Sequence, residues 1–262
     1  MIHVSDFHKA YDHTIAVEGL NFEVAPGQIL GLVGPNGAGK TTTLRAIHGV
    51  LPASRGHIEV NGKRVDESPL ETKASLGFIP DDPQLFADLT VRQHLAFVAS
   101  AYRVQDVSSK TLRLLDQFEL TSKVDARAGD LSRGMRQKLA ICCAYLHDPT
   151  AILFDEPLTG LDPRGIRTLK QSMLQRARDG AAVIVSSHLL AMVEDICSHV
   201  LILKLGSQKF FGPIDQLRLT FADKSDGATL EDIFFRATEE SATAEHSIDA
   251  TPIESPEPVT IS

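Results

Sequence analysis

The order of apolar and polar residues along the chain predicts strands that alternate with helices. Residues 14–24 partly alternate, as in a strand with one buried face, and residues 57–65 place an Asn-Gly pair between two short β-rich runs, which is typical of a hairpin. Residues 28–34 run apolar into a glycine-rich loop, and residues 41–50 follow with helical spacing. The first part of the chain therefore predicts β structure, followed by a strand, a glycine loop and a helix.

The middle and the last third of the chain differ in pattern. Between about residues 82 and 146 the apolar residues lie three and four positions apart, which predicts a helical subdomain. Three compact apolar runs follow, at 151–154, 181–187 and 199–204, with helical stretches between them. Short apolar strands separated by helices are typical of a parallel sheet that is covered on both faces. We therefore expect an α/β fold with a mainly parallel sheet.

Charge is distributed unevenly along the chain. The 262 residues carry a formal charge of −8, but the last 26 residues hold six acids and no Lys or Arg. We assign residues 1–236 to one folded domain and expect the tail at 237–262, which is rich in Ser, Thr, Pro and Glu, to be disordered. Without the tail, the chain is nearly neutral and lacks the basic excess of nucleic-acid-binding proteins, so we expect no nucleic-acid partner.

The cysteines and the apolar runs bear on the compartment. Cys142, Cys143 and Cys197 lack the spacing of zinc or redox sites, which fits unpaired thiols in a reducing compartment. The longest dense apolar run, at 139–146, is too short to span a bilayer, and the start of the chain lacks a signal-peptide layout. We expect the protein to stay in the cytoplasm.

The glycine loop carries the strongest chemical signal. Gly34, Gly39, Lys40 and Thr41 fit the pattern GxxxxGK[ST], in which backbone N–H groups surround phosphate oxygens and a side chain in place of glycine would block their approach. Lys40 would bridge the terminal phosphates, and Thr41 would bind Mg²⁺ through its hydroxyl. The pattern predicts a site for a nucleoside triphosphate with Mg²⁺, formed by Gly34, Pro35, Asn36, Gly37, Ala38, Gly39, Lys40, Thr41 and Thr42.

Polar side chains follow two of the predicted buried strands. Asp155 and Glu156 end the first of them; we expect Asp155 to hold Mg²⁺ through water and Glu156 to act as the general base on the attacking water. In the alternative interpretation both acids cap the turn before Pro157. His188 follows the strand at 181–187, at the same edge of the sheet, and its position singles it out as a catalytic residue beside Glu156 and Lys40.

These motifs, together with residues 131–139 between them, resemble the ATP-binding cassette (ABC) family, whose marker is an LSGGQ-like sequence ahead of the Asp-Glu pair. The resemblance covers about residues 1–236. It implies a P-loop NTPase core of the RecA type, an N-terminal antiparallel β subdomain and a helical subdomain that carries the signature. It further implies that the ligand is ATP and that the chain is an ATPase.

The resemblance assigns roles to residues outside the glycine loop. Tyr11 looks like the aromatic residue that stacks on adenine, and a plain surface tyrosine is the alternative. In the signature, Leu131 to Met135, Ser132 and Gly134 would donate to the γ-phosphate held by a second subunit, which implies two chains, most simply a homodimer, around two ATP molecules. Asp162 resembles the loop aspartate that crosses this interface; it could instead, or also, cap the helix after Pro163.

Two positions depart from the commonest family pattern. Arg133 stands at the first signature glycine, and Asp81 stands where the family usually has a glutamine that links Mg²⁺ and the attacking water to the helical subdomain. An aspartate can still reach Mg²⁺ through water, so we predict that Asp81 belongs to the metal site and that coupling is weakened or altered. Gln84 is the alternative residue for this role.

The partner is also implied by resemblance. Residues 83–102, with Phe86 and Leu89 near their start, resemble the surface that receives the coupling helices of a membrane permease, although most of their apolar side chains are expected in the subdomain core. Residues 77–91, 132–149 and 229–235 most resemble bacterial exporters of drugs, antibiotics, polysaccharides, lipids or ions. We therefore expect an exporter's ATPase subunit that is bound, through the permease, to the inner face of the cell membrane.

Two other functions are compatible with parts of the pattern. A soluble ABC protein acting on ribosomes or in DNA repair typically carries two cassettes or a long coiled coil, and this chain has one copy of each motif and no sustained heptads. A P-loop kinase for small molecules would not require residues 131–135.

Overall fold

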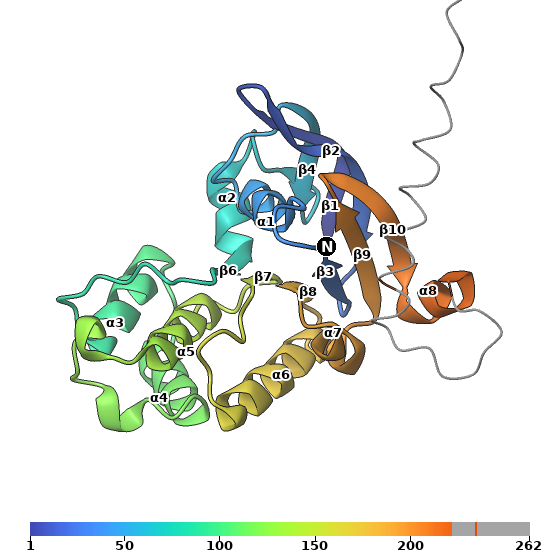
Figure 1. Ribbon diagram of the computed structural model, residues 1–262. Helices are drawn as coiled ribbons and strands as arrows, with labels where there is room; N and C mark the ends of the chain where they lie inside the picture. The colour runs from blue at the N-terminus through green and yellow to red at the C-terminus, as the bar shows by residue number, and fades with distance from the viewer. Residues whose placement is uncertain (222–233, 235–262) are drawn as a thin grey trace, which may run out of the picture.

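The computed structural model describes residues 1–221 and residue 234, and the predicted acidic tail lies outside these residues. Ten strands form one curled sheet in the order β5-β4-β1-β2-β10-β9-β3-β8-β7-β6 (Figure 1). One half of this sheet is antiparallel and the other half is mainly parallel. The predicted α/β fold class is confirmed.

The antiparallel half comes from the beginning of the chain. It contains β1 (Ile2–Tyr11), β2 (Thr14–Val24), β4 (Arg55–Val60) and β5 (Lys63–Arg64). The predicted Asn-Gly hairpin joins β4 to β5, with Asn61 and Gly62 both at positive φ, 53° and 74°. Two successive positive φ angles are the geometry of the turn that matches the twist of an antiparallel pair.

The parallel half contains β9 (His199–Lys204), β3 (Ile29–Val33), β8 (Ala182–Ser187), β7 (Ala151–Asp155) and β6 (Leu76–Ile79) as neighbours. Every residue of β3, β7 and β8 is buried, which explains why their sequences are almost entirely apolar. β10 (Ser207–Pro213) runs antiparallel to β9 and meets β2 at one parallel bridge, so it joins the two halves.

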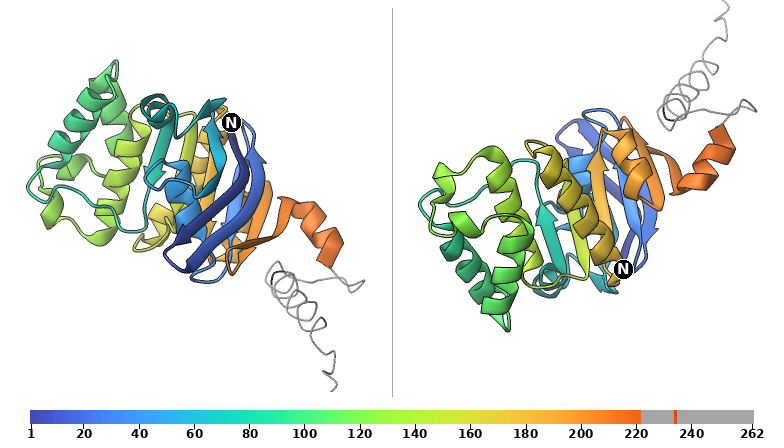
Figure 2. Two further views of the ribbon diagram at one scale, coloured as in Figure 1. Left: turned by 90° about the horizontal axis from the view of Figure 1, so that it is seen from above. Right: turned by 90° about the horizontal axis from the view of Figure 1, so that it is seen from below.

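The helices cover both faces of the parallel half, as Figure 2 shows. α1 (Lys40–Ile47) packs between this half and the antiparallel strands, whereas α5 (Arg133–Tyr145) and α6 (Pro163–Arg178) pack on the opposite face. α3 (Val91–Ala101), α4 (Val107–Gln117) and α5 all lie within residues 82–146; α3 and α4 pack against α5, which itself contacts β6 (Figure 1). The helices are α1 (Lys40–Ile47), α2 (Pro69–Ser75), α3 (Val91–Ala101), α4 (Val107–Gln117), α5 (Arg133–Tyr145), α6 (Pro163–Arg178), α7 (Leu190–Ile196) and α8 (Ile214–Phe221).

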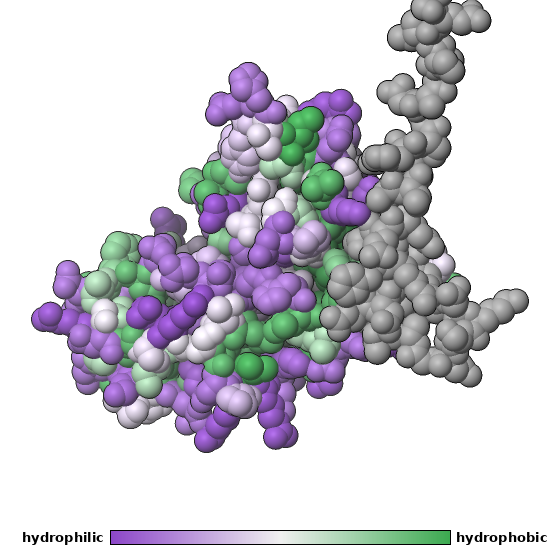
Figure 3. All heavy atoms as spheres, in the orientation of Figure 1, coloured by the Kyte–Doolittle hydropathy of each residue, from purple (hydrophilic) through white to green (hydrophobic). Residues whose placement is uncertain are grey.

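The surface carries both kinds of side chain. On the face drawn in Figure 3, hydrophilic residues surround smaller hydrophobic patches, as on most water-facing proteins. Within residues 1–221 and residue 234, no helix has both the length and the apolar character needed to cross a membrane.

Candidate functional site: a pocket at the carboxyl edge of the parallel sheet

The glycine loop joins β3 to α1. β3 ends at Val33 and α1 begins at Lys40, so the loop leaves from the carboxyl edge of the parallel strands. Gly37 and Gly39 have φ angles of 80° and 103°, a region that glycine enters at no steric cost. The loop therefore encloses the amino end of α1, where unpaired N–H groups attract anions.

The reason why glycine is needed differs along the loop. A Cβ at Gly34 would lie 2.4 Å from the carbonyl oxygen of Leu203, and one at Gly39 would lie 2.8 Å from that of Ala16. At Gly37 no atom lies within 4 Å of such a Cβ. At Gly34 and Gly39 the backbone of neighbouring strands already forbids a side chain, and the expectation that glycine makes room for phosphate stays a prediction.

Lys40 is the buried cation of the loop, with 7% of its side chain exposed. Its Nζ donates to the carbonyl oxygens of Gly34 at 2.7 Å and Pro35 at 3.2 Å, and it lies 3.9 Å from Oε1 of Glu156. Burial lowers the pKa of Lys40, while the charges of Glu156 and Asp155 act in the opposite direction. The ammonium group is thus held inside the loop, where a phosphate could take the place of the two carbonyl oxygens.

Asp155 ends β7 beside the loop. The parallel register pairs Asp155 with Ser186 and Val33 with Ser187, so the carboxyl ends of β3, β7 and β8 meet at one edge. The Asp155 side chain is 4% exposed, and its Oδ1 accepts from Thr41 Oγ1 at 3.2 Å and from Ser186 Oγ at 2.7 Å. The two hydroxyl donors offset the cost of burying a carboxylate.

Glu156 and His188 lie at the open side of the same edge. Nδ1 of His188 lies 2.9 Å from Oε2 of Glu156, and the two side chains are 61% and 20% exposed. Glu156 has a φ of 47°, which is unusual for a residue other than glycine. The backbone N–H of Glu156 donates to both the carbonyl oxygen and Oγ of Ser186, and the same Oγ donates to Asp155. Ser186 therefore fixes both Asp155 and Glu156.

Lys40, Thr41, Asp155 and Glu156 line one pocket, whose lining does not include Gly34, Pro35 or His188. It brings together the glycine loop, the Asp-Glu pair and Asp81, which the sequence places far apart. Ala16 of β2 also lines the pocket. The sequence gives no sign of this role, because the side chain of Ala16 is small and apolar. The lining consists of Ala16, Asn36, Gly37, Ala38, Gly39, Lys40, Thr41, Thr42, Asp81, Asp155 and Glu156.

The signature segment forms the amino end of α5. Ser132 is the N-cap residue: its Oγ accepts from the N–H of Met135 at 3.3 Å, and the side chain is exposed. Gly134 lies so close to the loop after β7 that a Cβ there would come within 2.5 Å of the Gly160 carbonyl oxygen. Ser132 and Gly134 are not among the residues that line the pocket of their own chain.

Asp81 is held by the other unusual residue. Arg133 Nη2 donates to Asp81 Oδ1 at 3.3 Å, and both side chains are about half exposed. Gln84, the alternative candidate, donates to Asp82 and lines a different groove, beside α5. Within the described residues, Asp81 is therefore the one of the two that reaches the nucleotide pocket.

Two further candidates lie apart from the pocket lining. Tyr11, at the end of β1, is 43% exposed, and Lys9 Nζ lies 5.1 Å from its ring centroid. The contact of Tyr11 with adenine stays a prediction. Asp162 caps α6, with Oδ1 accepting from the N–H of Gly165 at 2.8 Å. This capping role was one of the two expected for Asp162, and it leaves the other untested.

Comparisons with known proteins agree with this geometry. A sequence profile described as ABC transporter matches residues 17–159. The ABC-type transporter ATP-binding protein EcsA of Bacillus subtilis (strain 168) is 35% identical over 244 residues, which cover 92% of this chain and 98% of EcsA. The Nod factor export ATP-binding protein I of Burkholderia pseudomallei (strain 1710b) is 34% identical over 200 residues, which cover 76% of this chain and 66% of that protein.

A solved structure shares the fold over most of this chain. The structure of an ATP binding subunit of an ABC transporter superposes with a TM-score of 0.86 at 33% identity, and the match covers 91% of this chain and 100% of that one. The order of the motifs, the pocket and the fold therefore point to one and the same family.

Proposed function

Because the chain belongs to the ABC transporter family, we propose that two copies of it close over ATP and thereby drive export through a separate membrane permease. Membership makes the chain the ATP-binding, ATP-hydrolysing subunit of a transporter. It supports neither the soluble ribosome or DNA-repair protein nor the small-molecule kinase. The observation that carries the proposal is the single sheet edge at which Lys40, Asp155 and Glu156 meet.

The pocket has the donors that a triphosphate with Mg²⁺ requires. The hydroxyl of Thr41 and the carboxylate of Asp155 are hard oxygen ligands, the type that Mg²⁺ prefers. The described residues contain no cluster of three or more His, Cys, Asp or Glu that could hold a metal ion. Thr41 and Asp155 would therefore hold Mg²⁺ together with phosphate and water oxygens, and the ion would neutralise charge on the phosphates.

The side chains divide the hydrolytic work. Lys40 would exchange the carbonyl oxygens of Gly34 and Pro35 for phosphate oxygens, since a phosphate is the stronger acceptor. Glu156, on the open side of the pocket, would take a proton from the attacking water. His188 contacts the other oxygen of Glu156 and would fix the orientation of that carboxylate.

The amino end of α5 supports the proposed dimer. It presents the exposed hydroxyl of Ser132 and the first N–H groups of a 13-residue helix, outside the pocket of its own chain. A helix terminus of this kind is an anion site. In a two-fold arrangement each α5 end would face the triphosphate of the other copy, as the family resemblance implies.

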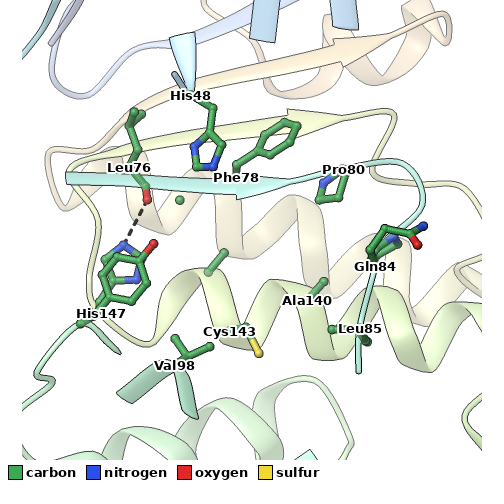
Figure 4. Close-up of a pocket in the computed structure, with 14 residues that line it drawn as sticks. His48, Leu76, Phe78, Pro80, Gln84, Leu85, Val98, Ala140, Cys143 and His147 are labelled. Carbon is green, nitrogen blue, oxygen red and sulfur yellow. Dashed lines mark hydrogen bonds between the residues drawn. The ribbon is translucent and has the colours of Figure 1, made fainter. Parts of the chain in front are cut away.

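A groove beside α5 supports the permease partner. Figure 4 shows one wall formed by Leu76 and Phe78 of β6 and by Pro80, which follows the strand, opposite Ala140 and Cys143 of α5. The groove is mainly apolar and lies between the sheet and the helical subdomain, the two parts that nucleotide binding would move. We propose that a cytoplasmic helix of the permease docks there.

The neighbouring surface supplies exposed aromatic area. Phe86 and Phe97 are 59% and 55% exposed and form an edge-to-face pair with ring centroids 5.7 Å apart. Val91, Leu95 and Ala99 of the same segment are buried, but more of its apolar residues are exposed than buried, so the expectation that most of them belong to the core is wrong. Exposed aromatic side chains next to an apolar groove are typical of an interaction surface.

Co-purification tests the proposal. Expressed together with its neighbouring genes, the chain should be recovered with a multi-span membrane protein, and Phe86→Asp should remove that protein while ATP binding persists. The matched control is Leu112→Asp, since Leu112 is also exposed, 64%, but lies on α4 away from the groove. Recovery of the wild-type chain with ribosomes, or transfer of phosphate to a metabolite, would contradict the proposal.

A further inference from the structure

The two residues that depart from the commonest family pattern contact each other. Arg133 opens α5 and Asp81 lies 52 positions earlier, yet the guanidinium group donates to the carboxylate at 3.3 Å. Asp81 also lines the nucleotide pocket, together with Lys40 and Glu156. Compared with the family pattern, Arg133 adds a positive charge and Asp81 adds a negative charge, and the two charges pair with each other.

Arg133 is held in place from a second side. Its stem lies against Gly160, where an added Cβ would come within 3.0 Å of both Cγ and Cδ of Arg133. Gly160 has a φ of 79°, and this positive φ together with the nearby stem favours glycine. The guanidinium group therefore projects from a fixed base toward Asp81.

The same face of α5 also holds the backbone next to Asp81. Gln137 lies one helical turn after Arg133, is 1% exposed, and donates through Nε2 to the carbonyl oxygen of Pro80 at 3.3 Å. Residues i and i+4 of α5 thus hold two successive residues of one loop. Through this loop the pocket is connected to the helix that Ser132 caps.

Charge explains why such a connection is needed. A carboxylate at the wall of a triphosphate pocket repels the ligand, and at an exposed site this repulsion corresponds to about a fivefold loss of affinity. An arginine that donates to the same carboxylate cancels most of that field. The first signature glycine of the family could not do this, because it has no side chain.

We propose that Arg133 is a positioning residue that neutralises Asp81 and fixes it at the pocket wall, so that the pocket accepts ATP in spite of the added carboxylate. The inference rests on the proposed ATPase function and adds a residue to its site. It also separates two roles of Arg133, compensation within its own chain and direct contact with the ATP of a second copy. If Arg133 only compensates the charge of Asp81, ATP binding no longer needs Arg133 once Asp81 is replaced by a neutral residue.

Equilibrium binding tests the proposal with four forms of the full-length chain: wild type, Arg133→Ala, Asp81→Asn and the double variant. The probe is ATP in EDTA, measured by calorimetry, because hydrolysis then stops and the ligand keeps its full negative charge. Arg133→Ala should weaken binding about fivefold, and Asp81→Asn should bind at least as tightly as wild type. The double variant should return to within about twofold of wild type.

Salt and ligand charge give two further readouts that a packing defect would not move. The loss in Arg133→Ala should shrink at high salt, because screening weakens an exposed interaction. It should also be smaller for ADP than for ATP, which carries one more negative charge. Arg133→Lys, which keeps the cation, should retain most of the affinity.

The outcomes distinguish this inference from the function on which it rests. A loss in Arg133→Ala that persists in the double variant would overturn the compensation, as would weaker binding by Asp81→Asn alone. If the wild-type chain does not bind ATP at all, the proposed function is wrong instead. The control is Arg92→Ala on α3, whose exposed ion pair with Asp125 at 3.1 Å lies outside the pocket and whose loss should leave affinity unchanged.

Discussion

The nucleotide pocket and the amino end of α5 are built in opposite ways. In the pocket, Lys40 and Asp155 are 7% and 4% exposed, and each has two or more hydrogen-bond partners within the chain. At the end of α5, Ser132 and Arg133 are exposed, and Ser132 makes one capping bond to the backbone. The pocket is organised by its own chain, whereas the end of α5 presents donors outward.

This difference indicates where a second copy is needed. Hydrogen bonds within one chain already hold the side chains of the pocket in position, so one subunit can bind ATP by itself. Arg133 already donates to Asp81 of its own chain, but Ser132 and Gly134 lie outside the pocket lining among the described residues, so they would reach a phosphate only when two subunits meet. Binding should therefore depend on the pocket and on the Arg133 that neutralises Asp81 at its wall, and closure on both regions.

The largest effect is expected from Glu156→Gln. Removing the general base should lower kcat by about a hundredfold to ten-thousandfold and leave ATP binding intact, because the carboxylate is needed for the proton and not for the cradle. With hydrolysis stopped, the ATP-bound dimer should accumulate, which size-exclusion chromatography with light scattering would detect. A monomeric Glu156→Gln chain that is saturated with ATP would break the proposed relation between the two regions.

A substitution of Ser132 tests the amino end of α5, the second of the two regions. Ser132→Asp keeps a side chain that can cap α5 but places a negative charge against the proposed phosphate, so it should bind ATP and fail to dimerise. Thr90→Ala is the matched control, because Thr90 caps α3 with a capping box and its loss should cost about 1 kcal/mol of stability without affecting the dimer. If Ser132→Asp dimerises like wild type, the end of α5 is not the site of the second phosphate contact.

His188→Ala should have an intermediate effect. Because His188 contacts Glu156 at 2.9 Å and is 61% exposed, its loss should misorient the base and lower kcat between about tenfold and a hundredfold, with little change in KM. Steady-state kinetics would measure this. A large rise in KM with unchanged kcat would instead assign His188 to ATP binding.

The two regions also differ in how far the sequence predicts them. The glycine loop and the Asp-Glu pair lie in short contiguous motifs next to buried strands, so their meeting at one sheet edge follows from the parallel order. The contact of Arg133 with Asp81 joins segments 52 positions apart, and no local pattern encodes it. Ser186 was also missed, because a serine at the end of an apolar strand reveals its role only when the register places it beside Asp155.

The fold shows the same limit. The strands β3, β7 and β8 were predicted because full burial makes them apolar runs, whereas β6 has only four residues, too few for a clear period. These three strand predictions thus rest on burial, and the pairing of β10 with β2 through one bridge depends on the assembled sheet. Tertiary neighbours, which the sequence does not encode locally, decide these elements.

The smallest effect concerns His48 in the groove beside α5. Burial lowers the pKa of His48 to about 4, and nearby Lys73 acts in the same direction. The unfolded chain takes up this proton below a pH of about 6.5 and the folded chain only below about 4, so stability is present above this window and is lost as pH falls through it.

His48→Gln should therefore flatten the acid side of the stability profile, measured by urea unfolding at a series of pH values between about 4 and 7. The control is His13→Gln, since His13 is exposed and its replacement should leave the profile unchanged. An equally steep loss of stability in His48→Gln would show that another group is responsible.

The most direct measurement mixes two inactive variants of the chain. Lys40→Ala lacks the cradle cation but has an intact Ser132, and Ser132→Asp has an intact cradle but a repelling α5 end. If each ATP is held between one chain's pocket and the other chain's α5, a mixed dimer contains one complete site, and an equimolar mixture should recover up to about a quarter of wild-type ATPase activity, the value for random pairing. An activity no greater than the sum of the two variants measured separately would contradict a site shared between two copies.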